Sequence, residues 1–399
     1  MDKNKNFDRI ERLPPYVFAE VNSMKAKERS LGEDIIDFGM GNPDMPTPQH
    51  IVDKLCDTIK DPKSHRYSVS RGILGLRRAQ SNYYKRRFNV DVDPENEVIV
   101  TLGSKEGLAN LASAITANGD KVIVPNPSYP IHPYGFVIAG ASVLSIDNSP
   151  NENFIKNLNK ILSSTNNKAK ALVLNYPNNP TTRIATLDFF KEVVDICIKY
   201  GVYILSDIAY AEIYFDGEIP PSILEVPKAK NIAVEFSSLS KTYSMPGWRV
   251  GFAVGNRSLI QALTKIKSYL DYGAFTPVQV AAIAALNGPQ ECVKEIRSVY
   301  MKRRNILVEG FSRVGWEMDS PKATMFVWAK LPKKFLNIGS LEFSKKLLKY
   351  GKVAVSPGIG FGKNGEGYVR IGLVENEYRI RQAIKNVKLF FDNYEENKK

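Results

Sequence analysis

Cysteine, histidine and long apolar runs are scarce in this sequence, and each scarcity excludes a class of protein. The 399 residues include three widely separated cysteines, which excludes a disulfide-stabilised scaffold and indicates reduced thiols. No apolar run approaches the roughly 20 residues that span a bilayer, and the charged N-terminus lacks the apolar segment of a signal peptide. We therefore expect a cytoplasmic protein that does not bind membranes. The three histidines lack the spacing of metal ligands or of a catalytic triad, so no metal site is expected.

Acidic residues are outnumbered by basic ones, 42 to 55, which leaves a net charge of +13. Such an excess can attract nucleic acids. Here the basic residues are spread along the chain, and the densest clusters, 84–87 and 301–304, lie in helical patterns typical of a solvated face. We therefore expect no nucleic-acid partner, whereas small anionic substrates suit the charge. A hydrophobic content of 43% is enough to bury a core.

The middle of the chain alternates short apolar runs with helical patterns. Most runs are nearly continuous Val, Ile and Leu, as expected of strands buried on both faces. Between them lie segments such as 187–200, in which Phe190, Val194 and Cys197 recur at helical spacing. This alternation predicts a mostly parallel sheet covered by helices on both faces, with ligands bound beyond the carboxyl ends of the strands. The predicted strands are 98–102, 121–124, 141–146, 171–174, 202–205, 232–236 and 250–254.

After residue 289 the pattern changes. The order of the remaining elements indicates a second, smaller α+β domain. The first 50 residues are punctuated by Pro and Gly. The sequence thus predicts an N-terminal arm (1–50) that joins the small domain, a large domain (51–289) and the small domain (290–399). In the small domain we expect helices over 290–314, 341–350 and 377–394, and strands at 325–329, 352–356 and 368–372.

One glycine-rich motif can be set aside. Residues 360–365 match G-x-G-x-x-G, the pattern of dinucleotide-binding sites. That function requires a helix after the glycines to hold the pyrophosphate, whereas the following residues 368–372 have the pattern of a strand. No G-x-x-x-x-G-K-[S/T] phosphate loop occurs either. The residues that carry chemistry are therefore expected at the strand ends.

Four segments that follow predicted strands carry polar side chains. The first, 103–107 (Gly-Ser-Lys-Glu-Gly), opens a helix, where free backbone N–H groups suit an anion; the alternative is an ordinary tight turn. The second, 175–180 (Asn-Tyr-Pro-Asn-Asn-Pro), offers short polar side chains on a fixed backbone; again the alternative is a turn alone.

The other two segments carry a carboxylate and an amine. Asp207 follows a buried strand, so it either caps a helix or balances a positive charge, since a buried carboxylate needs a partner. Lys241 follows three serines and precedes Arg249 by eight residues. Serine hydroxyls and an arginine suit a phosphate dianion, and a lysine among them loses its proton more easily and attacks a carbonyl. Together the segments call for a ligand with a phosphate, a protonatable ring nitrogen and an aldehyde, which is pyridoxal 5′-phosphate (PLP).

The sequence resembles the class I/II, fold-type I PLP-dependent aminotransferases over nearly its whole length. The motifs that carry the resemblance are Asn178-Asn179-Pro180-Thr181, Ser206-Asp207-Ile208-Ala209-Tyr210 and Ser238-x-Ser240-Lys241-x7-Arg249-Val250-Gly251. A closer likeness to bacterial glutamate–pyruvate (alanine) transaminases rests on segments 12–18, 37–44, 103–108, 125–132 and 356–362. The resemblance implies an α/β fold with a mostly parallel seven-stranded sheet in the large domain, beside a smaller α+β domain.

The family's residue roles carry over position by position, as the resemblance implies. Lys241 would bind the cofactor aldehyde and move a proton, and Asp207 would pair with the ring nitrogen. Tyr210 and Asn179 would hydrogen-bond the phenolic oxygen, and Tyr129 would stack on the ring. The phosphate would be held by Gly103, Ser104, Lys105, Ser238, Ser240 and Arg249, and Tyr67 would reach the phosphate of the neighbouring subunit, which implies a homodimer with shared active sites.

The resemblance also implies a place for the substrate. Arg370 would bind the α-carboxylate with Asn179 and Gly41; the alternative is a buried structural ion pair. Lys105 would favour a distal carboxylate. Tyr16 lies in a segment where relatives specific for acidic substrates carry small hydroxyl residues, so a simple aspartate transaminase fits less well.

We therefore expect an aminotransferase that works by ping-pong half-reactions between an L-amino acid and a 2-oxo acid. Alanine/pyruvate with glutamate/2-oxoglutarate is the first expectation, and aspartate/oxaloacetate is the second. A PLP-dependent lyase of the same fold is an alternative, because the motifs around the ring do not separate the two classes. A transcriptional regulator of this fold is not expected, since no separate DNA-binding module is evident.

Overall fold

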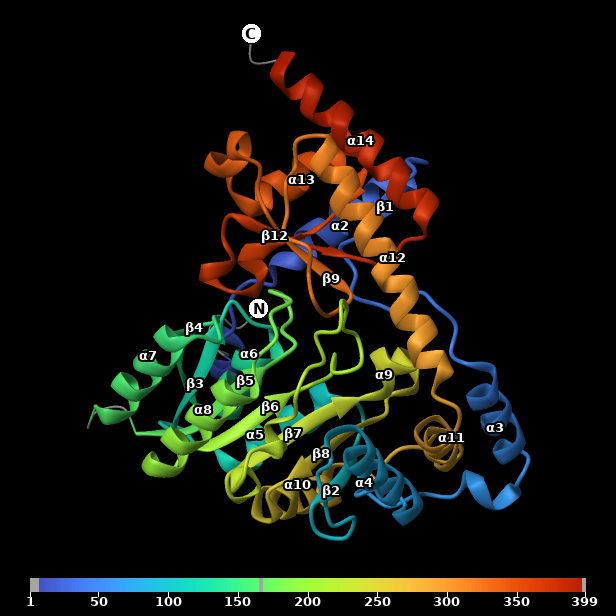
Figure 1. The fold of residues 1–399 in the computed structure, drawn as a ribbon, viewed down its shortest axis with the longest axis vertical. Coiled ribbons are helices and arrows are strands. Elements are labelled where there is room, and N and C mark those ends of the chain that lie inside the picture. The colour runs from blue at the N-terminus through green and yellow to red at the C-terminus, as the bar shows by residue number, and fades with distance from the viewer. Residues whose placement is uncertain (1–6, 165–167, 397–399) are drawn as a thin grey trace, which may run out of the picture.

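The computed structural model describes residues 7–164 and 168–396. Its main feature is a seven-stranded sheet in the order β2-β8-β7-β6-β5-β3-β4 (Figure 1). β8 pairs antiparallel with both β2 and β7, whereas the other pairs of neighbouring strands in this sheet are parallel. All seven predicted strands are confirmed, with ends that move by two residues at most. The strands are β2 (Val98–Thr101), β3 (Lys121–Asn126), β4 (Ser142–Asp147), β5 (Ala169–Asn175), β6 (Tyr203–Asp207), β7 (Ala233–Ser238) and β8 (Gly251–Gly255).

Helices cover both faces of this sheet because alternate strand residues point to opposite sides. Ile99 and Leu205 pack into one hydrophobic cluster with α5, α6 and α10, whereas Val100 and Ile204 pack into another with helices of the opposite face. The first face has α5 (Ser104–Ile115), α6 (Ile131–Ala139) and α10 (Arg257–Leu270), and the second has α3 (Gln49–Ile59), α4 (Leu74–Phe88), α7 (Glu152–Ser163), α8 (Leu187–Tyr200) and α11 (Thr276–Asn287).

A smaller α+β domain lies above the sheet in the view of Figure 1 and has its own hydrophobic cluster. The run at 352–356 was expected to form one strand, and it forms two instead. Val353 and Ala354 pair with the N-terminal strand β1, whereas Ser356 and Pro357 pair with β12. A short apolar run does not reveal that the chain changes partners within it. The elements are α12 (Glu291–Arg313), β9 (Phe326–Lys330), α13 (Gly339–Gly351), β10 (Val353–Ala354), β11 (Ser356–Pro357), β12 (Tyr368–Gly372) and α14 (Glu377–Glu396).

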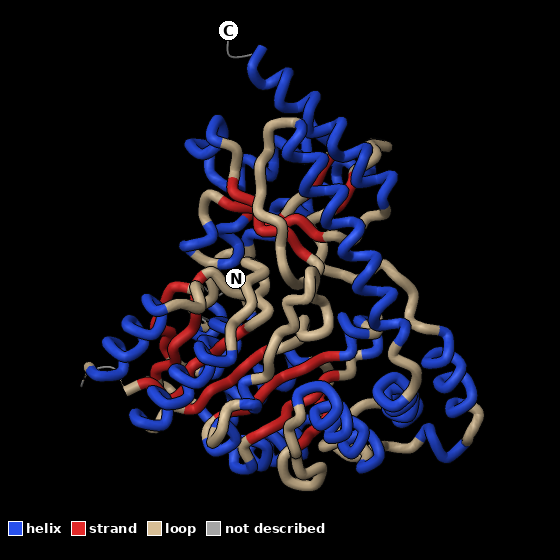
Figure 2. Tube along the Cα trace, viewed as in Figure 1, coloured by secondary structure: helices blue, strands red, loops and turns tan. Residues whose placement is uncertain are grey.

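The N-terminal segment packs against this small domain. Helix α2 (Val17–Ser30) contacts α13, and β1 (Ile36–Asp37) pairs with β10. Figure 2 shows the loop that leads from β1 down to helix α3 of the large domain. The boundaries at residues 50 and 289 stay predictions, and residues 1–6 of the expected arm lie outside the described residues.

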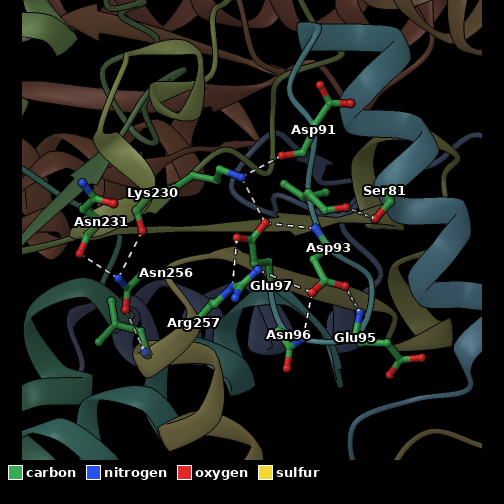
Figure 3. A network of polar contacts seen from close by, with 12 residues as sticks. Ser81, Asp91, Asp93, Glu95, Asn96, Glu97, Lys230, Asn231, Asn256 and Arg257 are labelled. Carbon is green, nitrogen blue, oxygen red and sulfur yellow. Dashed lines mark hydrogen bonds and ion pairs between the residues drawn. The ribbon is translucent and has the colours of Figure 1, made fainter.

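A polar network fastens the end of the large sheet at the amino end of β2 (Figure 3). The Glu97 carboxylate accepts from Lys230 Nζ at 3.1 Å, from Arg257 Nε at 3.4 Å and from the Asp93 backbone N–H at 2.9 Å. Asn256 caps α10 by accepting from the Leu259 N–H at 3.0 Å. The network thereby fixes the start of α10, whose other end lies next to the candidate site.

None of the helices in the described part of the chain combines the length and the apolarity needed to cross a membrane.

Candidate active site

A cleft of about 430 Å³ lies where the carboxyl ends of β5, β6 and β7 face the small domain. The predicted site residues, which are distant in sequence, meet here. Gly103 lies just behind its wall, and only Tyr67 is remote from it. The predicted residues that line the cleft are Tyr16, Gly41, Ser104, Lys105, Tyr129, Asn179, Asp207, Tyr210, Ser238, Ser240, Lys241, Arg249 and Arg370.

Lys241 lies on the short helix α9 (Leu239–Thr242), directly after β7. The Ser238 hydroxyl caps this helix by accepting from the Ser240 N–H at 3.2 Å. Lys241 Nζ donates to the carbonyl oxygen of Gly41 at 2.8 Å. Burial, with the nearby cations Arg370 and Arg249, lowers the pKa of Lys241 to about 8. A substantial fraction of this amine is therefore neutral near physiological pH and able to act as a nucleophile.

Asp207 ends strand β6 and is 5% exposed. Its Oδ2 lies 3.0 Å from His132 Nε2, and its Oδ1 accepts from the Ala209 N–H at 3.1 Å. No α-helix begins in the turn that follows Asp207 within the described chain, so the helix-cap alternative is wrong. The carboxylate instead lies in the cleft wall, where it can balance a positive charge.

His132 is a site residue that the sequence reasoning missed. It lies on α6 with 1% exposure, in contact with Asp207 and with its ring centroid 5.8 Å from that of Tyr129. The sequence reasoning set the histidines aside because their spacing fits no metal or triad. The signal that could have found His132 was its place three residues after Tyr129, in a segment that follows β3 at the same sheet edge.

The turn before α5 has the geometry of an anion site. Gly103 has φ +87°, and no side chain of the described residues caps the helix that begins at Ser104. The first-turn N–H groups are thus available to an anion. Arg249 lies against this turn and donates from Nη2 to the Leu102 carbonyl at 3.0 Å. The φ of +87° is one that residues with a side chain rarely adopt, and a Cβ atom on residue 103 would lie 2.2 Å from Arg249 Nη2, so this turn requires glycine.

Arg370 lies on β12 with its guanidinium carbon 4.1 Å from the ring centroid of Phe326 and 4.8 Å from that of Phe361. Nη1 donates to Asn179 Oδ1 at 2.8 Å, whereas the buried Nε has no hydrogen-bond partner among the described residues. Burial lowers the pKa of Arg370 to about 10, which leaves it charged at neutral pH. No carboxylate of the described residues pairs with Arg370, so the structural ion-pair alternative is wrong. A buried guanidinium with an unused N–H is complementary to a carboxylate ligand.

The aromatic side chains of Tyr129 and Tyr210 line the cleft together with these charged groups. The Tyr210 ring packs edge-on against Phe326, with centroids 5.6 Å apart. Burial raises the pKa of both Tyr210 and Tyr129 above the usual value, so both hydroxyls stay protonated at neutral pH and can donate hydrogen bonds. Phe326 and Phe361 were also missed by the sequence reasoning, because apolar residues in short strands and turns are more often core residues.

Of the predicted tyrosines, Tyr16 and Tyr67 are the most exposed, and only Tyr16 lines the cleft. Tyr16 is 65% exposed and lines the cleft, with its ring centroid 5.4 Å from that of Phe18. Tyr67 is 85% exposed and does not line the cleft of its own chain. Its ring instead lies 4.6 Å from that of Tyr272, centroid to centroid.

Comparison with known proteins agrees with this geometry. The family described as aminotransferase class I and II matches residues 33–387. The chain belongs to this family. It is an aminotransferase, and the family uses PLP.

Several aminotransferases match over nearly the whole chain. AatC of Rhizobium meliloti is 58% identical over 98% of this chain and 97% of its own length. The glutamate-pyruvate aminotransferase AlaC of Escherichia coli is 54% identical over 97% of this chain and 94% of its own length. An LL-diaminopimelate aminotransferase of Moorella thermoacetica is 44% identical over 95% and 97%.

Solved aminotransferase-fold structures match as well. Substrate-bound BacF of Bacillus subtilis superposes with a TM-score of 0.90 at 34% identity, covering 97% of this chain and 98% of that one. A Thermus thermophilus aspartate aminotransferase double mutant gives a TM-score of 0.89 at 27% identity, covering 97% of this chain and 100% of that one. The predicted fold type is therefore confirmed.

Proposed function

We propose that this aminotransferase binds PLP in the described cleft, with Lys241 as the covalent attachment point. The observation that carries the proposal is that one cleft holds an amine of lowered pKa, a buried carboxylate and an uncapped helix start beside an arginine. These three features match the aldehyde, the ring nitrogen and the phosphate of PLP. The required glycine at 103 supports the fit, since a side chain there would displace Arg249.

Each of these groups has a defined task. When bound, PLP supplies an aldehyde that takes up the amino group and a ring that withdraws electrons from the α-carbon. Asp207, held by His132, would keep a proton on the ring nitrogen because an adjacent anion favours the charged form. Tyr210 and Asn179 would donate hydrogen bonds to the phenolic oxygen, and Tyr129 would hold the ring.

Backbone and side-chain donors together would hold the phosphate. The backbone groups of Gly103, Ser104 and Lys105 would hold it at the start of α5. Ser238, Ser240 and Arg249 complete the site; the two serine hydroxyls lie 2.9 Å apart.

Lys241 also moves the proton of the reaction. Once its amine is free and neutral, it can take a proton at the α-carbon of the substrate and return it at another atom. Its pKa of about 8 suits this exchange, because a group that titrates near the operating pH can act both as base and as acid.

Arg370 binds the α-carboxylate of every substrate, with Asn179 and the Gly41 backbone beside it. We infer L-alanine/pyruvate and L-glutamate/2-oxoglutarate as the substrate pairs. The likeness to the glutamate-pyruvate aminotransferase of Escherichia coli supports this choice, and Lys105 at the cleft can bind the distal carboxylate of glutamate. Aspartate/oxaloacetate is the second candidate; Tyr16 at the mouth counts against it.

We further propose that the chain forms a homodimer in which Tyr67 reaches the phosphate site of the partner. Exposed aromatic and aliphatic side chains around Tyr67 support this, because a monomer rarely leaves such a cluster in water. The cluster comprises Tyr67, Val69, Tyr269, Leu270, Tyr272 and Phe275, with exposures of 85, 53, 84, 60, 64 and 42%.

A half-reaction panel tests the proposed function. The PLP-loaded protein is mixed with about twenty amino acids, one at a time and without a 2-oxo acid, and the rates are ranked by kcat/KM. We expect conversion to the pyridoxamine form with one 2-oxo acid released per site, fastest with alanine and glutamate. Steady release of ammonia or a thiol would identify a lyase instead, and preference for aspartate would identify the second candidate.

A further inference from the structure

A fully buried lysine lies behind the turn that begins α5. Lys267 Nζ donates to Glu106 Oε1 and to Asp271 Oδ2, each at 2.8 Å, and its side chain is 0% exposed. Burying an ammonium group is costly unless it is paired. Neither Lys267 nor Glu106 lines the cleft in the described chain, so their side chains lie behind its wall.

Glu106 fixes the backbone of the anion-binding turn. Its Oε2 accepts from the Leu102 N–H at 2.8 Å, while the Leu102 carbonyl accepts from Arg249 Nη2 at 3.0 Å. Both peptide groups of Leu102 are therefore held, and the next residue, Gly103, has φ +87°. The direction of the Ser104 and Lys105 N–H groups depends on this turn.

The charge of Glu106 creates a conflict that Lys267 removes. A carboxylate in the first turn of a helix interacts favourably with the helix dipole, but here it would repel an anion bound at the same helix start. Lys267 is a full positive charge at 2.8 Å from that carboxylate. Because Lys267 is buried, solvent screens this pair little.

We propose that Lys267 is a positioning residue for the cofactor phosphate. It acts through Glu106, which it orients and neutralises, so that Glu106 can hold the turn without opposing the dianion. Asp271 anchors Lys267 from the other side, and its own Oδ1 accepts from the Gly273 N–H at 2.6 Å. This inference rests on the proposed binding of PLP in the cleft.

The test measures the affinity of the apo-protein for PLP and for pyridoxal, which lacks the phosphate. Lys267→Met should weaken PLP binding by about tenfold or more, because an unpaired carboxylate is left near the dianion. Pyridoxal binding should change by less than about twofold. Combining Lys267→Met with Glu106→Gln removes both charges and should restore PLP affinity to within about threefold of wild type.

Lys230→Met is the matched control. It also removes a lysine from an ion pair, the 3.1 Å contact with Glu97, but that contact lies beside the first turn of α10, in the network of Figure 3. Ten residues of α-helix, about 15 Å, separate that turn from Lys267. The control should leave the ratio of PLP to pyridoxal affinity unchanged.

Three results would overturn the proposal: wild-type PLP affinity in Lys267→Met, an equal loss for PLP and pyridoxal, or failure of Glu106→Gln to restore affinity. If Lys267→Met does not fold, the ratio of PLP affinity to pyridoxal affinity in Lys267→Gln and in the double variant tests the proposal instead. Failure of the proposed function is distinguishable, because the wild-type protein would then bind neither PLP nor pyridoxal.

Discussion

Replacing Arg370 by lysine tests whether its guanidinium receives the substrate α-carboxylate. Nη1 already donates to Asn179 Oδ1 at 2.8 Å, and Nη2 lies 3.4 Å from both Gly39 O and Ser356 Oγ. The buried Nε has no partner within the part of the chain that the structure describes. A bound carboxylate can therefore take two charge-assisted bonds, and a lysine cannot reproduce that fork.

The expected loss follows from one such bond. A hydrogen bond to a charged group contributes about 1.5–3 kcal/mol, so Arg370→Lys should lower kcat/KM by about 10- to 150-fold. The loss should be similar for L-alanine and L-glutamate, because both carry the same α-carboxylate. Stopped-flow half-reactions with each amino acid measure it, and PLP affinity should stay at the wild-type level.

Arg304→Lys provides the control. Arg304 is also buried, at 4% exposure, but its Nη1 pairs with Asp216 at 2.6 Å. This variant should lower stability and leave kcat/KM nearly unchanged. Wild-type kcat/KM in Arg370→Lys, or a loss with only one of the two amino acids, would refute the assignment of Arg370 to the α-carboxylate.

Three further predictions concern other side chains of the cleft. Lys105→Met should raise KM for glutamate by up to about fivefold and leave that for alanine unchanged, since an exposed pair contributes about 1 kcal/mol or less; equal effects would contradict a distal-carboxylate role. Asp207→Asn should slow the half-reaction by at least about 100-fold, because no anion then holds a proton on the ring nitrogen; a wild-type rate would show that the carboxylate is only structural. Lys241 has a pKa of about 8 in the folded apo-protein against 10.5 for an ordinary lysine. Between these pH values the unfolded chain holds more protons, so the free energy of unfolding of wild type relative to Lys241→Met should rise by up to about 3 kcal/mol from pH 8 to 10.5. Denaturant titrations measure it, and a flat difference would contradict the lowered pKa.

The large sheet was predictable because most of its strands are buried on both faces and therefore read as continuous apolar runs; the edge strand β4 is the exception. The site was predictable for a related reason. Parallel strands bring their carboxyl ends to one edge, so polar residues after β5, β6 and β7 had to meet. The direct hydrogen bond between Arg370 and Asn179 was not predicted, since it joins strand β12 to the loop after β5 across 191 positions.

Other parts of the site could not be predicted from local patterns. His132 looks like an isolated histidine until the fold places it 3.0 Å from Asp207. The run at 352–356 splits between two sheets because its first part pairs with β1, near the start of the chain, whereas its last part pairs with the following strand β12. Lys267 looks like any charged residue on the surface of an amphipathic helix, and only the packing of α10 against α5 buries it.

The central claim is that the amine of Lys241 forms the covalent bond to PLP in this cleft. Sodium borohydride treatment of the PLP-loaded protein, followed by digestion and peptide mass spectrometry, tests it directly. We predict a reduced, irreversible pyridoxyl-phosphate adduct on the peptide that contains Lys241, and none in Lys241→Ala. An adduct on a different lysine, or bound PLP that leaves Lys241 unmodified after reduction, would contradict the claim.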